Sequence, residues 1–163
     1  MTQSAQFPDV PDKIRHRMSR VRKVDTKPEL IVRRALHAMG YRFRLHRKDL
    51  PGTPDIVMPS RRKVIFVHGC FWHQHGCKLS GRPPEVRAEY WLPKLKRNQE
   101  CDEEAQRALA AAGWDALTVW ECQTKDQPAL RGLLSNFVGG HGGKQHRDRS
   151  QAPSPVRRPA TGR

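Results

Sequence analysis

The sequence predicts an α/β fold in which helices flank a mixed central sheet. Apolar residues recur with helical spacing in three segments and with strand spacing in four, in the order helix, three strands, helix, strand, helix. Short turns join the first three strands, which are therefore expected to be antiparallel, and a long helical segment precedes the fourth. This order indicates a sandwich of helices around one sheet.

The first helix is expected to begin at a capping box. Thr26 and Glu29 stand three residues apart, and Pro28 lies in the first turn that would follow. An apolar stripe with helical spacing comes next, and Gly40 stands where a C-terminal glycine commonly ends a helix. The stripe consists of Ile31, Val32, Ala35, Leu36 and Met39.

Three strands are expected after this helix. Between residues 41 and 45, apolar and polar side chains alternate with the period of a half-buried strand. Beyond the turn residues Pro51 and Gly52, short apolar runs at 56–58 and 63–67 predict the second and third strands, joined by a tight connection.

The second half of the pattern holds two helices and one strand. Residues 85–112 are rich in Ala, Glu, Lys, Arg and Leu, and Gly113 follows them, which predicts a long helix. Pro93 is expected early in this helix or at a kink in it. Residues 116–120 predict the fourth strand, and a last helix is expected over 127–138.

Composition divides the 163 residues into one domain and two basic ends. The apolar patterns run from residue 24 to residue 138, enough for one domain with a hydrophobic core. Residues 139–163 are rich in Gly, Pro, Ser, Arg and Lys and hold almost nothing to bury, so a disordered basic tail is expected. Residues 1–23 are expected to form a basic arm.

The charge indicates a polyanionic partner. There are 31 Lys and Arg against 16 Asp and Glu, a formal net charge of +15. No apolar run approaches the roughly 18 residues of a membrane span, and charged residues interrupt the N-terminal segment where a signal peptide needs an apolar core. We therefore expect a cytoplasmic protein that binds nucleic acid and no membrane. The arm residues expected to follow a phosphate backbone are Arg15, Arg17, Arg20, Arg22 and Lys23, with Met18 as an apolar residue among them.

A dense group of metal-binding residue types lies between residues 68 and 77, which hold three of the eight histidines and two of the four cysteines. Imidazoles and thiolates in tetrahedral sets are what Zn²⁺ prefers. The loop candidates are Cys70, His75 and Cys77, and Cys122, just beyond the fourth strand, is the candidate for the fourth ligand. A single buried cysteine is usually a small apolar core residue, but this density favours metal binding. Cys101, surrounded by acidic residues, is interpreted as a bystander.

A second candidate site centres on Asp55, at the start of the second strand. Pro54 is expected to push Thr53 into an extended conformation, so that Asp55 projects from a sheet edge. An Asp after a proline is by itself more often part of a turn. In an antiparallel pair joined by a short turn, however, the start of one strand lies beside the end of the next. Asp55 is therefore expected to meet residues 67 and 68.

This meeting would assemble the parts of a hydrolytic site. A hydrolytic nuclease needs a hard cation such as Mg²⁺, held by oxygen ligands. His68 and His73 would stand beside the carboxylate, and an imidazole that titrates near neutral pH can deprotonate the attacking water. For Glu29 the capping box is a sufficient role, although its carboxylate could also face the same phosphate or its metal-bound waters.

At these residues the chain resembles the very-short-patch repair (Vsr) endonucleases, bacterial enzymes that nick DNA at T:G mismatches. The resemblance covers about residues 11–135. It rests on LPGTPDIV, on VIFVHGCFWHQHGC, on EYWLPKLKRN followed by an Asp, and on GWDALTVWEC. The combination of HGCFWH with a following Cys/His pair is highly specific.

The resemblance implies a fold like that of type II restriction endonucleases, with a structural Zn²⁺ that pins the catalytic loop. It implies Mg²⁺-dependent hydrolysis of one strand of double-stranded DNA beside a T:G mismatch, leaving a 5′-phosphate and a 3′-hydroxyl. Such mismatches arise by deamination of 5-methylcytosine. A monomer is expected, with mismatch-repair proteins as further candidate partners.

The resemblance also implies roles for particular residues. Asp55 would hold the Mg²⁺ together with the backbone carbonyl of Val67, a position where the family pattern has Thr. His73 would activate water, His68 would support the phosphate or the metal shell, and Glu29 would complete the site. The implied zinc ligands are Cys70, His75, Cys77 and Cys122.

An aromatic pair is implied to distort the DNA. Phe71 and Trp72, with Met18 from the other side, would wedge into the base stack beside the mismatch. Insertion of apolar side chains costs stacking energy, and a mismatch lowers this cost. Cys101 departs from the family pattern, which has a basic residue before the Asp, so a DNA contact is expected to be lost there.

Three other functions remain open from the residues. A nuclease of the same fold could act on a different DNA, such as an unmodified duplex. A non-catalytic zinc module could bind DNA without any need for Asp55. A basic protein of RNA complexes would fit the charge, but it would leave Asp55, His68 and His73 unexplained.

Overall fold

The computed structural model describes residues 24–81, 85 and 88–139. The N-terminal arm, with its predicted DNA contacts Arg15, Arg17, Met18, Arg20, Arg22 and Lys23, lies outside these described residues, as does the tail from residue 140. The described elements are α2 (Lys27–Ala38), β1 (Arg44–Leu45), β2 (Ile56–Met58), the 3₁₀ helix η1 (Pro59–Arg61), β3 (Lys63–His68), α3 (Ala88–Ala111), β4 (Asp115–Trp120), the 3₁₀ helix η2 (Glu121–Lys125) and α4 (Gln127–Gly139).

The four strands form one mixed sheet in the order β1-β2-β3-β4. β1, β2 and β3 are antiparallel, as predicted, whereas β3 and β4 are parallel. Ile65 at the centre of β3 faces Ile56 across one ladder and Leu117 across the other. The parallel pair brings the C-terminal ends of β3 and β4 to the same end of the sheet, with His68 beside Trp120.

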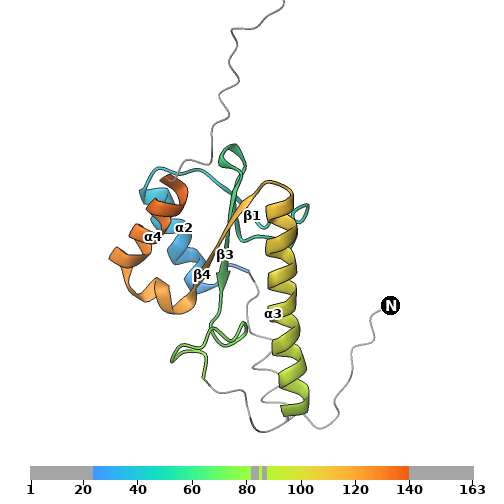
Figure 1. Cartoon of the computed structure of the whole chain (residues 1–163). Helices are drawn as coiled ribbons and strands as arrows, with labels where there is room; N and C mark the ends of the chain where they lie inside the picture. The colour runs from blue at the N-terminus through green and yellow to red at the C-terminus, as the bar shows by residue number, and fades with distance from the viewer. Residues whose placement is uncertain (1–23, 82–84, 86–87, 140–163) are drawn as a thin grey trace, which may run out of the picture.

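Helices cover both faces of this sheet (Figure 1). α2 and α4 pack on one face, where they bury Ile56, Ile65 and Val119. α3 packs on the other face, against Val64 and Phe66. The alternation of strand side chains explains this division, because successive residues of a strand point to opposite faces. The predicted α/β sandwich with a mixed sheet is therefore confirmed.

Local sequence explains the ends of α2. Thr26 Oγ1 accepts a hydrogen bond from the Glu29 amide, and Glu29 Oε2 accepts one from the Thr26 amide, both at 3.4 Å. This is the predicted capping box. Gly40, just beyond the helix, has a φ of 82°, which a residue with a side chain rarely adopts.

The first strand is shorter than predicted. Alternation predicted a strand over 41–45, but only Arg44 and Leu45 pair with β2. The Tyr41 amide instead donates to the Leu36 carbonyl at 3.0 Å, which ties this residue to the end of α2. After Leu45, the left-handed φ of 46° at His46 turns the chain away from the ladder.

Two expectations about the approach to β2 are wrong. Thr53 is not extended but left-handed, with a φ of 49°. Its amide donates to the Leu50 carbonyl at 3.1 Å, and this turn overrides the preference that the following proline imposes. Asp55 also does not project from a sheet edge, because it precedes β2, which lies between β1 and β3.

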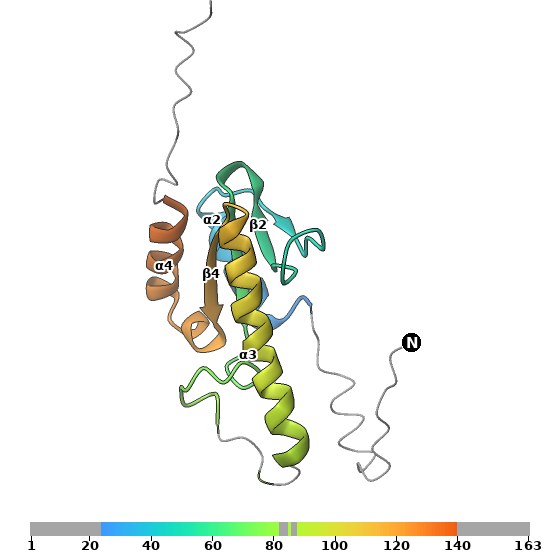
Figure 2. The same ribbon diagram turned by 45° about the vertical axis from the view of Figure 1, so that its right-hand side comes forward.

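α3 is longer than the sheet that it covers. Its N-terminal half extends past the end of the sheet, where the loop that follows β3 also lies (Figures 1 and 2). It starts at Ala88 and contains Pro93 in its second turn. Among the helices that the structure describes, none is long and apolar enough to cross a membrane.

Candidate active site and metal centre

Asp55 lies against the C-terminal end of β3. Its Oδ2 accepts a hydrogen bond of 2.7 Å from the Val67 amide. Its own carbonyl accepts one of 3.2 Å from the His46 amide, which extends the contact between β1 and β2 by one residue. Burial raises the pKa of Asp55 to about 6, although the Val67 hydrogen bond acts in the opposite direction. The meeting of Asp55 with residue 67, expected from the strand order, is present.

A charged network from α2 borders Asp55. Glu29 is only 1% exposed, and its Oε1 accepts from the Arg33 guanidinium. The same oxygen lies 3.0 Å from His46 Nε2, and His46 Nδ1 lies 3.9 Å from Asp55 Oδ1. Arg33 also pairs with Asp25 at 2.7 Å. His46 thus stands between the capping-box glutamate and Asp55.

Two histidines and one aspartate meet on the α3 side of the sheet. His68 ends β3, His73 lies in the loop that follows, and Asp102 comes from α3. The two imidazoles stack with ring centroids 3.8 Å apart. Asp102 Oδ2 lies 2.5 Å from His73 Nδ1 and 3.6 Å from His68 Nδ1. Because a carboxylate only accepts hydrogen bonds, His73 carries a proton on Nδ1, and its Nε2 is left as an acceptor.

His68 is the more buried of the two imidazoles. Burial and the neighbouring His73 lower the pKa of His68 to about 4, against the opposing effect of Asp102. At neutral pH this ring is therefore uncharged, so it can share hydrogen bonds with a phosphate but adds no positive charge.

α3 also holds the backbone of the loop that carries His73. The Asn98 side-chain amide donates to the Trp72 carbonyl at 2.9 Å, and the Gln99 amide donates to the His73 carbonyl at 3.5 Å. With Asp102, these residues lie within five consecutive positions of α3. The imidazole of His73 is therefore positioned through both its ring and its backbone.

Aromatic side chains of this loop and of α3 gather together. Phe71 and Trp72 are half-buried and lie edge to face, with ring centroids 5.1 Å apart. Trp91 of α3 contacts both, at centroid distances of 6.1 and 6.0 Å. Lys94 Nζ lies 5.5 Å from the Trp72 ring centroid. Neither Phe71 nor Trp72 belongs to the two hydrophobic cores of the described residues.

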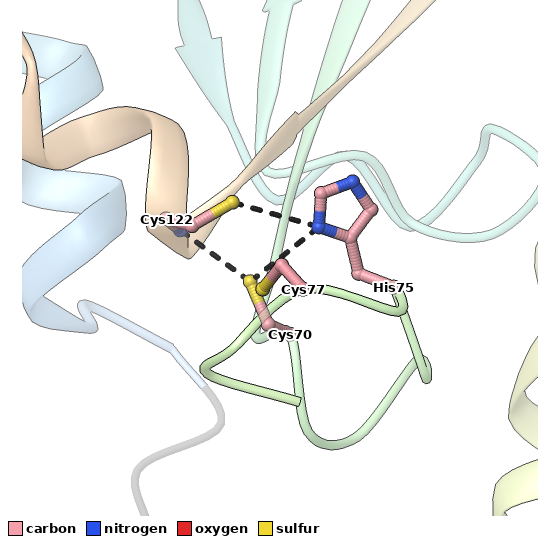
Figure 3. A group of neighbouring side chains, drawn as sticks. All are labelled: Cys70, His75, Cys77 and Cys122. Atoms are coloured by element: carbon pink, nitrogen blue, oxygen red, sulfur yellow. Dashed lines mark hydrogen bonds between the residues drawn. The ribbon is translucent and has the colours of Figure 1, made fainter. Parts of the chain in front are cut away.

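Cys70, His75, Cys77 and Cys122 converge at the same end of the sheet (Figure 3). One ligand atom from each lies within 4.8 Å of all the others. His75 faces the thiols with Nδ1, which is 3.5 Å from Cys122 Sγ and 3.9 Å from Cys70 Sγ. In tetrahedral zinc sites, sulfur ligands about 2.3 Å from the ion stand roughly 3.8 Å apart. Three thiols and one imidazole at this spacing fit Zn²⁺.

The surroundings of this cluster also suit a metal. The Cys122 amide donates to Cys70 Sγ at 3.4 Å, and such hydrogen bonds stabilise a thiolate ligand. His75 stacks on Trp120 with ring centroids 4.2 Å apart, which fixes the imidazole. Burial raises the pKa of Cys70 to about 12. A divalent cation would offset this cost of ionisation.

Comparison with known proteins identifies the family. The family model for the DNA mismatch endonuclease Vsr matches residues 9–79. The type II nicking enzyme V.XorIIP of Xanthomonas oryzae pv. oryzae is 54% identical over 128 residues, which cover 78% of this chain and 93% of the relative. This chain belongs to the Vsr family. The DNA mismatch endonuclease Vsr of Escherichia coli is 38% identical over 142 residues, covering 82% of this chain and 90% of the relative.

A third relative of this Vsr-family chain is the type II nicking enzyme V.NmeAIP of Neisseria meningitidis, which is 36% identical over 121 residues, covering 74% of this chain and 86% of the relative. Family membership and these relatives show that the chain is a DNA endonuclease. The site just described is therefore the candidate active site of a Vsr endonuclease.

The structure brings most of the predicted site residues of this Vsr endonuclease to one end of the sheet. Asp55 contacts Val67, His68 contacts His73, and Phe71 contacts Trp72. The contacts of His46 link Glu29 to Asp55. Cys101 is exposed on α3 and stands apart from the four clustered ligands.

Three residues that border this site were not predicted from the sequence. Asp102 is bonded to His73, His46 links Glu29 to Asp55, and Trp91 contacts the aromatic pair. Asp102 stands among Glu100, Glu103 and Glu104, so charge alone gives no signal for it. His46 was one polar position in an alternating strand. The motif EYWLPKLKRN, followed by an Asp, contained the signal for both Trp91 and Asp102.

Proposed function

We propose that this endonuclease nicks one strand of double-stranded DNA beside a T:G mismatch by Mg²⁺-dependent hydrolysis. The observation that carries the proposal is an unbroken series of contacts from a half-buried carboxylate to an oriented base. Asp55 bonds to the Val67 amide, the next residue His68 stacks on His73, and His73 bonds to Asp102. We further propose that the fold is that of restriction endonucleases and that the Cys/His cluster holds a structural Zn²⁺.

Asp55 and Val67 are the proposed Mg²⁺ ligands. The Asp55 carboxylate is largely buried and its pKa is raised to about 6, so a cation beside it would offset the cost of its charge. In a strand the N–H and C=O of one residue point to the same side, and the Val67 N–H points at Asp55. Its carbonyl therefore faces the same side. Mg²⁺ prefers such oxygen ligands, and when bound it would polarise the phosphate and stabilise the leaving oxygen.

His73 is the proposed general base. Asp102 holds the proton on Nδ1, so Nε2 can accept a proton from the attacking water. Neutral His68 packs against this ring and restricts its orientation. Glu29 completes the site at a distance, through His46.

Phe71 and Trp72 are the proposed wedge. Their position outside both hydrophobic cores, in the loop that carries His73, supports this role. Inserting an apolar side chain into a base step costs a few kcal/mol of stacking, and less at a mismatch. The distance between the inserted aromatic side chains and His73, the proposed general base, would then determine which phosphate is cut. Met18, the predicted third member, lies outside the described residues.

The experiment that tests the proposal compares two labelled duplexes, identical except for one T:G mismatch in a methylation-site context, with Mg²⁺ and without it. Wild type is expected to nick the T strand of the mismatched duplex only, and only with Mg²⁺. Asp55→Ala is expected to bind the duplex and to lose at least roughly 10³-fold in rate. Asp49→Ala removes an exposed carboxylate from the preceding loop and serves as the matched control, with wild-type activity.

A second candidate function has one observation in its favour. The Xanthomonas relative, at 54% identity, is named a type II nicking enzyme. Nicking of matched and mismatched duplexes at equal rates would favour a nuclease of different DNA specificity. Binding without cleavage by zinc-loaded wild type, in several sequence contexts, would favour a DNA-binding zinc module.

A further inference from the structure

His46 occupies an unusual position between two carboxylates. Its side chain comes from the end of β1, where a left-handed φ of 46° directs it toward α2. Nε2 lies 3.0 Å from Glu29 Oε1, and Nδ1 lies 3.9 Å from Asp55 Oδ1. The His46 imidazole therefore lies between Glu29, the buried glutamate of the capping box, and Asp55, which lies against the C-terminal end of β3.

Arg33 decides which nitrogen of His46 carries the proton. Its Nη2 lies 2.9 Å from His46 Nε2 and also contacts Glu29 Oε1. A guanidinium can only donate hydrogen bonds, so Nε2 must accept. The proton of the neutral ring is then on Nδ1, the nitrogen that faces Asp55.

The same guanidinium argues against a metal between Asp25, Glu29 and His46. Their ligand atoms lie within 4.8 Å of one another, as in a metal site. Arg33, however, contacts all three residues and supplies a positive charge there. Arg33 therefore occupies the place that a cation would take, and Nδ1 of His46 is the ring nitrogen of this group that faces Asp55.

The two oxygens of Asp55 are then held from two directions. Oδ2 accepts from the Val67 amide at 2.7 Å. Oδ1 lies 3.9 Å from Nδ1 of His46, which is beyond a direct hydrogen bond, so this interaction is electrostatic. Each oxygen has a second lone pair, which remains free for a cation.

We propose that His46, held by Arg33 and Glu29, is a positioning residue that orients the Asp55 carboxylate for its divalent cation. This inference rests on the proposed function, in which Asp55 is a metal ligand. It also gives Glu29 a role in the site that needs no contact with DNA, because Glu29 acts through Arg33 and His46. Partners that orient a metal ligand typically contribute about 10–100-fold to metal affinity.

Two variants separate orientation from mere packing. His46→Asn keeps a donor in place of Nδ1, because the amide nitrogen of Asn is also bonded to Cγ. His46→Leu has a similar size and no donor. His37, exposed on α2, provides the control variant His37→Leu. All proteins are loaded with Zn²⁺ first, and melting temperature and zinc content verify that each is folded.

The first measurement needs no catalysis. Histidine-selective ¹⁵N NMR of the wild type is expected to show the proton of His46 on Nδ1. Mn²⁺ titration followed by electron paramagnetic resonance is expected to show weaker binding by His46→Leu, by roughly 10–100-fold. Binding by His46→Asn and His37→Leu is expected within a few-fold of wild type. A neutral ring protonated on Nε2, or equal Mn²⁺ affinity of wild type and His46→Leu, would overturn the inference.

The second measurement is the Mg²⁺ concentration that gives half-maximal nicking, together with KM for the duplex. His46→Leu is expected to raise this Mg²⁺ concentration by roughly 10–100-fold and to leave KM for the duplex unchanged. If Asp55→Ala is inactive but His46→Leu needs the same Mg²⁺ concentration as wild type, the positioning role of His46 is rejected and the proposed function stands. Activity of Asp55→Ala equal to wild type would instead reject the proposed function.

Discussion

At the scale of single residues, Asp55 shows a conflict between function and stability. Its carboxylate lies in a site where burial favours the neutral form and raises its pKa to about 6. The ionised form, which a cation requires, therefore costs folding free energy at neutral pH when no cation is bound. An ionisable carboxylate is thus kept, at the expense of folding stability, at the position where the proposed chemistry needs a negative charge.

Asp55→Asn is therefore expected to stabilise the magnesium-free protein. The pKa of Asp55 rises from an ordinary 3.8 to about 6 on folding, so the folded state binds this proton more tightly than the unfolded chain does. Stability falls as pH rises between these values, and the full cost is present above pH 6. A shift of about two units corresponds to at most ~3 kcal/mol.

Urea unfolding of the zinc-loaded protein measures this effect. We expect a gain of roughly 1–3 kcal/mol for Asp55→Asn at pH 8 and about half of that gain at pH 5. Asp49→Asn, at an exposed carboxylate, is the control and should show no gain of this kind. A gain that does not change with pH would argue against a raised pKa as its cause.

At the scale of elements, the connection from β1 to β2 sets the position of Asp55 by packing on α3. Gly52 has a φ of 71°. A Cβ atom added there would lie 2.6 Å from Ala105 Cβ and 3.2 Å from the Phe66 ring. Ala105 is fixed to the helix backbone and cannot move aside. This glycine therefore permits both the turn and the close approach of the loop to α3.

Gly52→Ala is expected to destabilise the protein by about 2–5 kcal/mol. The left-handed backbone contributes roughly 1–2 kcal/mol, and overpacking against α3 contributes roughly 1–3 kcal/mol. Gly40→Ala is the matched control, because its φ is 82° but no atom lies within 4 Å of the added Cβ. Denaturant unfolding should show the larger loss for Gly52→Ala, and equal losses would contradict the close approach.

The elements also show what the sequence could predict. The capping box and Gly40 gave both ends of α2 because they act over a few residues. The clustering of the four proposed zinc ligands was predictable because Cys and His are uncommon, and three of these residues lie in one loop. The contact between His73 and Asp102 was not predictable, because it depends on where a helix of 24 residues crosses the sheet. No local pattern encodes that crossing.

At the scale of the whole molecule, the proposed zinc centre joins the ends of two neighbouring strands. Cys70 follows β3 and Cys122 follows β4, so the ligands come from parts of the chain far apart in sequence. The His73 loop leaves the sheet beside this centre and is held by α3 on its other side. A metal there would fix the loop relative to both strands.

Cys122→Ser is expected to lose the bound zinc and at least ~3 kcal/mol of stability, or roughly 10 °C in melting temperature. Nicking should fall with it, because the loop that carries His73 is released. Cys101→Ser changes an exposed thiol on α3 and should leave zinc content, melting and nicking unchanged. Retention of one zinc per chain by Cys122→Ser would show that Cys122 is not the fourth ligand.

The parallel pairing of β3 with β4 affects the nascent chain during synthesis. Residues 69–114 must be translated between the two strands, which takes roughly 2–9 s at about 5–20 residues per second. Through this interval β3, with the apolar residues Val64, Ile65 and Phe66, has a free edge that can pair with another chain. The buried strand of the finished enzyme is thus the segment of the unfinished one most exposed to aggregation, and slower translation of α3 would lengthen that exposure.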